Sequence, residues 1–202
     1  MNRPSVRTLW ERYRRRKSIL GIVSDFVFLA FIVALLVPTT RRMVSTSIIR
    51  LGMFQPKATS EVVYIAPEDL EWNITSLMGE KVALQFPTDK PVFINFWATW
   101  CPPCIAELPA LQRLYNQYGA KVDFYFISDE EPQTLKAFLE TKGYTIPVYT
   151  ITDHVKGRLY SRSIPTSFLI SPNGRLLMNK TGAAKWDGNK VKNTINYYLK
   201  NK

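Results

Sequence analysis

The sequence of 202 residues contains very little cysteine and histidine: two cysteines, Cys101 and Cys104, and one histidine, His154. A structural zinc site of the common types needs four nitrogen or sulfur donors, which these three residues cannot supply. The chain also lacks a nucleotide- or flavin-binding motif, internal repeats and low-complexity segments. We therefore expect no cofactor and no metal ion.

Acidic residues are scarce in the first part of the chain. Residues 1–57 hold eleven of the 27 Lys and Arg but only two of the 16 Asp and Glu. The formal net charge is +11, yet residues 58–202 are nearly neutral. A nucleic-acid-binding protein is expected to carry its basic patch on the folded domain. The location of the charge therefore argues against a nucleic-acid partner.

One long apolar run follows a basic tail, residues 1–17. The run covers the 20 residues 18–37, "SILGIVSDFVFLAFIVALLV", and is interrupted by Ser18, Gly21, Ser24 and Asp25. A helix of this length spans roughly 30 Å, the thickness of a bilayer core. Seven basic residues precede the run and three follow it within residues 38–52. This asymmetry predicts a single transmembrane helix with a cytoplasmic N-terminus.

A cleaved signal peptide is the alternative interpretation of this run. The apolar part of a signal peptide is normally ~7–15 residues long and ends at small residues. Here the run is longer and continues into "PTTRRM", which favours an uncleaved anchor. Asp25 lies about two turns inside the run, where it either stays near the lipid headgroups or pairs with a partner helix.

The remaining chain divides into a predicted linker, residues 38–60, and a predicted exported domain, residues 61–202. In this domain, strand and helix patterns alternate. Strands are predicted at 72–77, 82–86, 91–98, 121–128, 146–151, 166–170 and 175–180, and helices at 102–118, 131–143, about 154–161 and near the C-terminus. The first two strands form a hairpin. The order predicts an α/β fold, a mixed sheet with helices on both faces.

Both cysteines lie in "NFWATWCPPCIAELP", residues 95–109, after a buried strand and at the start of a helix. A structural disulfide between them would close a very short loop and stabilise the fold little. Free N–H groups and the helix dipole favour a thiolate on Cys101. Thiol–disulfide exchange also finds substrates on the exported side of a membrane. A redox-active dithiol is therefore favoured over a metal site or a structural bridge.

This segment, with Glu107 and "SIPTSFLI" at 163–170, resembles the membrane-anchored TlpA/ResA class of thioredoxin-fold thiol–disulfide oxidoreductases. The resemblance covers roughly residues 70–200. It implies a thioredoxin fold preceded by a β-hairpin extension and the transmembrane helix. It also implies a bacterial inner-membrane enzyme with its catalytic domain on the periplasmic or outer side. Such an enzyme reduces disulfides in exported proteins, including apo-cytochrome c, and receives electrons from a membrane thiol protein.

The resemblance assigns roles to matching residues. Cys101 is implied to attack a substrate disulfide, and Cys104 to resolve the mixed disulfide. Glu107 is implied to handle protons at the cysteines. Pro165 matches a cis-proline that lies opposite the cysteines. We expect substrate contacts from a set of residues around the cysteines: Trp100, Pro102, Pro103, Ile164 and Pro165.

Asn95 occupies the position at which cytoplasmic thioredoxins carry a buried aspartate. An amide cannot ionise, so proton transfer by that route is absent. This departure agrees with the role implied for Glu107 and is familiar in the exported branch of the fold.

Three alternative functions remain open. A disulfide oxidase or isomerase of the same fold would use the same residues, because direction depends on how strongly the protein stabilises the Cys101 thiolate. A non-catalytic docking subunit of a membrane complex would not need its cysteines. A peroxidase of this fold would place its cysteine in a threonine-rich loop, whereas Ala98 lies three residues before Cys101.

Overall fold

The computed structural model describes residues 18–200, with the exception of residues 37, 71–72, 85, 152–156, 160 and 162. The predictions for the basic tail and for His154 lie outside these residues, as does the first part of the short helix predicted near 154–161. The chain divides into two compact units, Met1–Ser45 and Thr46–Lys202.

The first unit contains α2 (Ile19–Leu36) and the beginning of α3 (Pro38–Leu51). Ser18 caps α2, because its hydroxyl accepts a hydrogen bond from the Gly21 N–H at 3.2 Å. The helix covers nearly the whole apolar run. Within the part of the chain that the structure describes, no helix combines the length and the apolar character needed to cross a bilayer.

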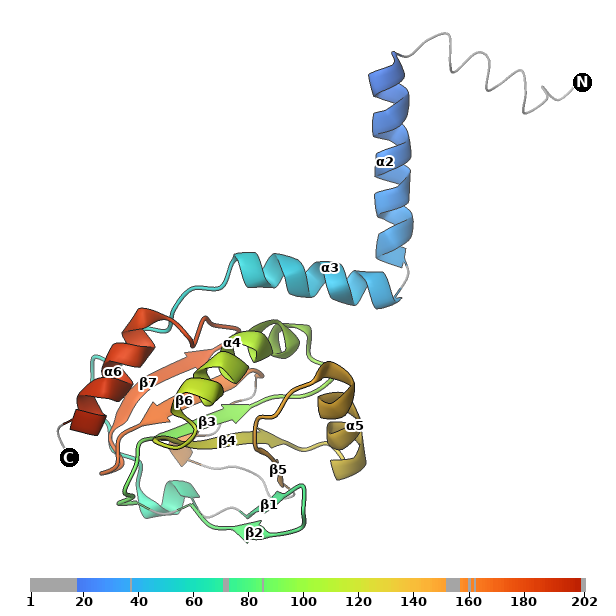
Figure 1. Ribbon diagram of the computed structural model, residues 1–202. Helices are drawn as coiled ribbons and strands as arrows, with labels where there is room; N and C mark the ends of the chain where they lie inside the picture. The colour runs from blue at the N-terminus through green and yellow to red at the C-terminus, as the bar shows by residue number, and fades with distance from the viewer. Residues whose placement is uncertain are drawn as a thin grey trace, which may run out of the picture. The chain divides into compact units, whose positions relative to one another are not determined.

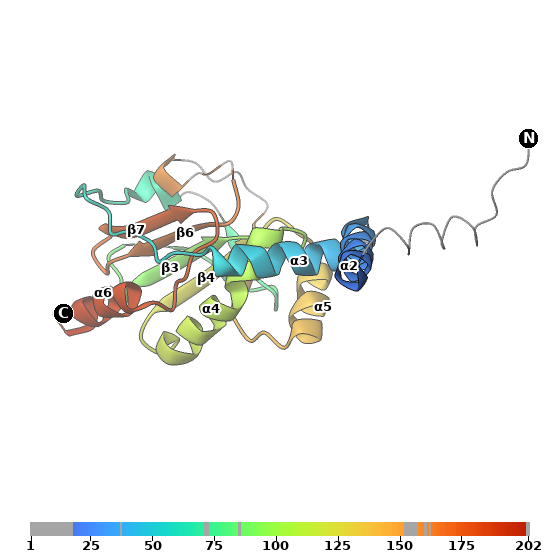
Figure 2. The same ribbon diagram turned by 90° about the horizontal axis from the view of Figure 1, so that it is seen from above.

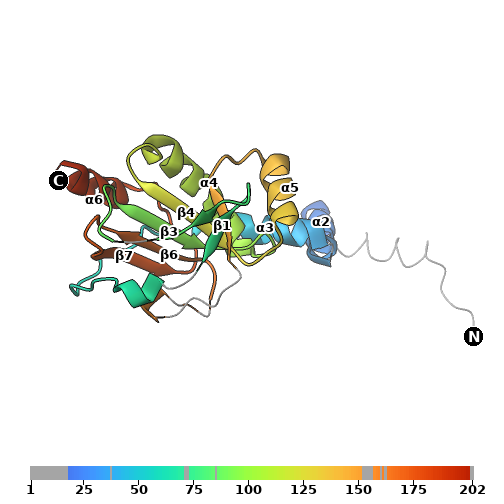
Figure 3. The ribbon, with the colours of Figure 1, turned by 90° about the horizontal axis from the view of Figure 1, so that it is seen from below.

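The second unit is built on one mixed sheet (Figures 1 and 3). Its described strands follow the order β2-β1-β5-β4-β3-β6-β7, with β3, β4 and β5 parallel and the other neighbouring pairs antiparallel. The strands are β1 (Ile74–Ser76), β2 (Lys81–Val82), β3 (Val92–Phe96), β4 (Asp123–Ser128), β5 (Val148–Ile151), β6 (Thr166–Ile170) and β7 (Leu176–Thr181). The mixed sheet and the predicted hairpin β1–β2 are confirmed.

Three α-helices lie on the same face of this sheet, as Figure 2 shows: α4 (Pro102–Tyr118), α5 (Pro132–Lys142) and α6 (Asn189–Lys200). The chain passes from β3 to β4 to β5 in one direction across the sheet. Right-handed crossovers therefore place α4 and α5 on one face. In the described residues, the other face carries only the 3-10 helices η1 (Pro67–Leu70) and η2 (Gly157–Leu159). Helices therefore lie on both faces, as predicted, but those on the second face are short 3-10 helices.

Strand β3 is buried on both faces, as its apolar sequence predicted. Phe93 contacts the Trp186 ring edge-to-face on the side of the α-helices, with ring centroids 4.9 Å apart. Ile94 points to the opposite side, into a second apolar cluster that contains Leu159 of η2. Burial on both sides makes β3 a rigid support for the segment that follows it.

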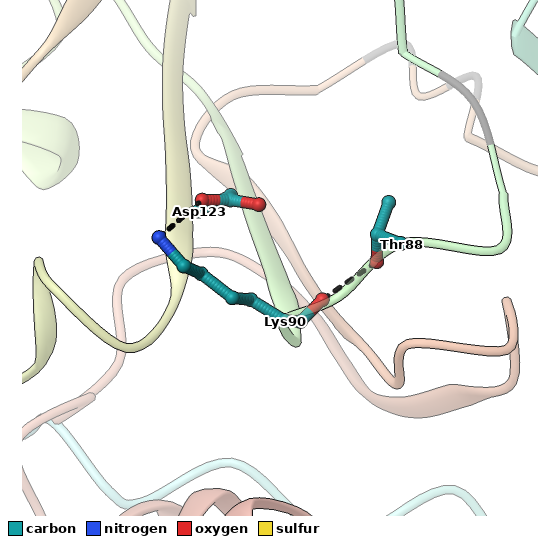
Figure 4. A network of polar contacts seen from close by, with 3 residues as sticks. All are labelled: Thr88, Lys90 and Asp123. Atoms are coloured by element: carbon teal, nitrogen blue, oxygen red, sulfur yellow. Dashed lines mark hydrogen bonds and ion pairs between the residues drawn. The ribbon is translucent and has the colours of Figure 1, made fainter. Parts of the chain in front are cut away.

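Polar contacts fasten the beginning of the parallel strands (Figure 4). Lys90 forms an ion pair with Asp123 at 3.7 Å, and Thr88 donates to the Lys90 carbonyl oxygen at 2.6 Å. The Thr88 N–H also donates to the carbonyl oxygen of Pro172 at 2.8 Å. These contacts align β3, β4 and the β6–β7 turn at the end of the sheet from which the chain runs toward the cysteines.

Residues 53–65, which we call the strap, run along the outer edge of β7. Ala58 pairs with Met178, and Tyr64 pairs with Arg175. The Thr59 N–H donates to the Leu177 carbonyl oxygen at 2.9 Å. Unpaired backbone groups of an edge strand are thereby satisfied. Much of the predicted linker therefore has regular structure, because residues 38–51 form α3 and the strap joins the sheet.

Candidate active site

Both cysteines lie where β3 gives way to α4. Cys101 is the N-cap of α4, with extended backbone geometry, and its sulfur accepts a hydrogen bond from the Cys104 N–H at 3.3 Å. Pro102 and Pro103 occupy the first helical positions, where a missing N–H costs nothing. The two sulfurs are joined in a disulfide. Because Pro102 and Pro103 have no N–H, the first available N–H of α4 is that of Cys104, and it points at the Cys101 sulfur. Together with the positive end of the helix dipole, this donor stabilises a thiolate there after reduction.

The loop before β6 lies beside the disulfide. The Ile164–Pro165 peptide bond is cis, as the resemblance implied. The Ile164 carbonyl oxygen lies 3.8 Å from the Cys101 sulfur. Pro165 is buried and Ile164 is half-buried. Residues more than 60 positions apart thus meet at the sulfur that an incoming disulfide would approach.

Access to the disulfide is uneven. Cys101 is 3% exposed to solvent, whereas Cys104 is completely buried. Trp100, directly before Cys101, is 60% exposed, although its neighbour Trp97 is buried against Phe138. An exposed indole beside the more accessible sulfur suits contact with another chain.

Glu107 lies one turn beyond Cys104 on α4 and is completely buried. One carboxylate oxygen accepts a hydrogen bond from the Asn95 side-chain amide at 2.9 Å, and the other accepts from the Ala184 N–H at 3.1 Å. Burial raises the pKa of Glu107 from 4.5 to about 8, although these two hydrogen bonds and the Trp186 indole act in the opposite direction. The predicted carboxyl at the cysteines is therefore mostly protonated at neutral pH.

Asn95 connects Glu107 to the loop of the cis-proline. Its side-chain amide also donates to the Ser167 hydroxyl at 2.8 Å, two residues beyond Pro165. Asn95 and Ser167 are both buried. Ser167 and Ala184 were not predicted as site residues, because only the fold brings them to Glu107. The sequence offered one indication of this network, Asn95, which stands where cytoplasmic thioredoxins carry a buried aspartate and which cannot ionise.

A second carboxylate, Glu130, fastens the segment before Cys101. Its two oxygens accept hydrogen bonds from the Thr99 N–H and the Thr99 hydroxyl, both at 2.6 Å. The Ser128 hydroxyl also donates to Glu130 at 3.2 Å. Charged acceptors make strong hydrogen bonds, so Glu130 holds residues 97–100 to the end of β4. Glu130 was not among the predicted site residues.

Comparison with known proteins agrees with this geometry. The model of the AhpC/TSA family matches residues 66–178. The chain belongs to the AhpC/TSA family. It is 32% identical to the thiol-disulfide oxidoreductase ResA of Halalkalibacterium halodurans over 129 residues, which cover 62% of this chain and 69% of ResA. It is 33% identical to the thioredoxin-like protein YneN of Bacillus subtilis over 109 residues, which cover 52% of this chain and 64% of YneN.

A solved structure supports the fold of this AhpC/TSA family member. A DsbF homologue from Corynebacterium diphtheriae superimposes with a TM-score of 0.52 at 23% identity, covering 71% of this chain and 99% of the homologue. At this identity the likeness concerns the fold alone. The match to ResA confirms the predicted class, a thioredoxin-fold thiol–disulfide oxidoreductase.

Proposed function

We propose that this protein is a membrane-tethered, extracytoplasmic reductase of disulfides in exported proteins. The observation that carries the proposal is the Cys101–Cys104 disulfide at the N-terminus of α4, beside the cis-proline loop and one turn from a buried carboxyl group. Each of these features serves a step of thiol–disulfide exchange.

The reaction begins with the reduced dithiol. The Cys101 thiolate attacks one sulfur of a substrate disulfide, and the other substrate sulfur leaves as a thiolate that takes up a proton. Cys104, deprotonated, then attacks the Cys101 sulfur of the mixed disulfide and releases the second substrate thiolate. The substrate gains two electrons and two protons, and the enzyme ends in the disulfide form. A membrane dithiol protein returns two electrons by the reverse exchange.

Glu107 is assigned the proton transfer that accompanies the second step. The Cys104 thiol must lose its proton inside the protein, because its side chain is completely buried. Glu107 is three residues further along α4, and therefore on the same face. A carboxyl group with a pKa of about 8 can exchange protons with a thiol near neutral pH.

Substrate contacts are assigned to the residues that surround Cys101. Trp100 offers an exposed aromatic surface, and the half-buried Pro102 and Pro103 shape the rim next to it. Ile164 presents its carbonyl oxygen beside the sulfur, directly before the cis-proline Pro165. An extended substrate segment could therefore dock along the cis-proline loop with its disulfide over Cys101.

The membrane tether is assigned to residues 18–37, with the folded domain on the outer side. Supporting observations are the apolar run after a basic tail and the exposed apolar side chains along α2, among them Leu20, Phe28 and Val33. In intact spheroplasts, a membrane-impermeant maleimide should label reduced Cys101. Labelling only after the cells are broken would reject this orientation.

Trapping tests the proposed reaction. In Cys104→Ala, Cys101 can still attack a substrate disulfide, but no second thiol can resolve the mixed disulfide that forms. Mixed disulfides with exported proteins should therefore accumulate on the full-length chain in membranes. Reductant should release these partners, and Cys101→Ala/Cys104→Ala is the matched control. A Cys104→Ala chain that captures no more protein than the control would reject the reductase. Apo-cytochrome c is the candidate substrate to look for first.

A further inference from the structure

The strap enters the domain next to the groups that surround Glu107. The Phe54 carbonyl oxygen accepts a hydrogen bond from the Lys185 N–H at 3.0 Å. Lys185 directly follows Ala184, whose N–H donates to the Glu107 carboxylate at 3.1 Å. The position of the Ala184 donor is therefore held by the residue at the beginning of the strap.

Gln55 holds the other end of the loop that connects β7 to α6, where α6 begins. Its side-chain oxygen accepts a hydrogen bond from the Lys190 N–H at 2.9 Å, in the first turn of α6. The residue before α6 is Gly188, which has no side chain to cap the helix. Gln55 supplies the missing acceptor from a distant part of the chain. Residues 185–190 are thus held at both ends by hydrogen bonds to the adjacent strap residues Phe54 and Gln55.

Gly188 leaves the space that Gln55 occupies. A Cβ atom at position 188 would lie 2.3 Å from the Gln55 side-chain carbon Cδ, far closer than atoms can approach. The backbone of Gly188 does not have the positive φ that only glycine tolerates. Its lack of a side chain therefore serves the close contact with Gln55 rather than a special backbone conformation.

A further contact reaches the other side of Glu107. The Arg50 guanidinium donates to the carbonyl oxygen of Ala106 at 3.2 Å, one residue before Glu107. Pro109 lacks the N–H that would bond to the Ile105 carbonyl oxygen, which weakens this turn of α4. Arg50 adds a donor to the neighbouring carbonyl, that of Ala106. The segment that leads into the strap thus contacts α4 on one side of Glu107 and the Ala184 loop on the other.

We propose that Phe54 and Gln55 are positioning residues for the reaction, because they hold the Ala184 N–H at the Glu107 carboxyl group. This inference rests on the proposed function, in which Glu107 handles protons at the cysteines. The beginning of the strap, which follows α3, would then help to determine the protonation of Glu107.

Charged groups on the elements around Glu107 are few in the described residues. Lys185 and Asp187 lie on the loop, and Arg113 lies on α4, where it pairs with Asp187 at 2.8 Å. Arg50 precedes the strap. Cys101 and Cys104 titrate only when they are reduced. An experiment on the oxidised protein therefore removes the thiols from the titration.

The test is the titration of Glu107 in the oxidised full-length chain in detergent micelles, followed by the ¹³C signal of glutamate side-chain carboxyl groups. Glu107→Gln identifies the signal. Gln55→Ala removes the side-chain oxygen that accepts the hydrogen bond from the Lys190 N–H. Gly188→Ala displaces the flexible Gln55 side chain without deleting it. Each variant should raise the Glu107 midpoint by at least about half a pH unit, because a buried carboxylate loses a donor. Lys57→Ala, an exposed neighbour on the strap, is the control.

The double variant Gln55→Ala/Gly188→Ala should shift the midpoint no further than either single variant, because both disrupt one contact. The positioning role would be overturned if either single variant shifted the Glu107 midpoint upward by less than about half a pH unit or shifted it downward. It would also be overturned if the two shifts added in the double variant. A Glu107 midpoint near the ordinary 4.5 in the unmodified chain would instead reject the proton-transfer role of Glu107. Trapping by Cys104→Ala does not depend on either result, so failure of the reductase proposal is separately visible.

Discussion

Burial of a single carboxyl group has consequences for stability as well as for chemistry. The pKa of Glu107 is about 8 in the folded protein, above the ordinary value of 4.5 expected in the unfolded chain. Between these two pH values, the folded protein holds a proton that the unfolded chain has lost. The free energy of unfolding should therefore fall as the pH rises through this window.

Glu107→Gln should remove this contribution. The slope from one proton is at most about 1.4 kcal/mol per pH unit, and urea unfolding at a series of pH values between 5 and 8 measures it. We expect the variant to show the flatter profile, while the exposed Glu140→Gln on α5 retains the original slope. Identical slopes for Glu107→Gln and the unmodified chain would show that Glu107 is not protonated on folding.

Residue identities at the site were largely predictable, whereas their surroundings were not. Cys101 and Cys104 were identified from a local motif and Pro165 from the family resemblance, and the structure places the carbonyl oxygen of the cis Ile164–Pro165 bond 3.8 Å from the Cys101 sulfur. The burial of Glu107 depends on Ala184, 77 positions away, and no local pattern indicates such a contact. Asn95 was recognised as unable to ionise, but its bond to Ser167 required the pairing of β3 with β6.

At the scale of elements, the strap is the least predictable feature. Its sequence, with Pro56 and small polar residues, is typical of a linker, and its pairing with β7 uses backbone atoms that carry no sequence signal. The strands and helices of the domain have clear periodicity, so they were predicted well. The placement of α4 and α5 on one face depends on strand order, which periodicity does not contain.

Strap pairing should contribute measurably to stability. Thr59→Pro removes the N–H that donates to Leu177, and losing a hydrogen bond and its geometry typically costs about 1–3 kcal/mol. Thr59→Ala is the matched control, because it keeps the N–H and deletes a buried hydroxyl that has no partner among the described residues. Denaturant unfolding should rank Thr59→Pro well below Thr59→Ala. Equal stability of the two variants would mean that the strap does not stay paired in solution.

At the scale of the whole molecule, the proposed function gives the two units separate tasks. The first carries the apolar run and the second carries the sheet, the cysteines and the strap. The excess of basic over acidic residues lies mostly in the first 57 residues. Because the domain is nearly neutral, its association with substrate should depend on docking near Trp100 more than on long-range electrostatic attraction.

The reduction potential of the Cys101–Cys104 couple distinguishes a disulfide reductase from a disulfide oxidase. It is measured by equilibrating the full-length protein with glutathione or dithiothreitol buffers and separating the reduced and oxidised forms. A disulfide reductase should have a potential between about −200 and −300 mV, a range that includes thioredoxin at about −270 mV. A potential of about −120 mV, typical of strong oxidants such as DsbA, would rule out a reductase and assign the protein to disulfide formation.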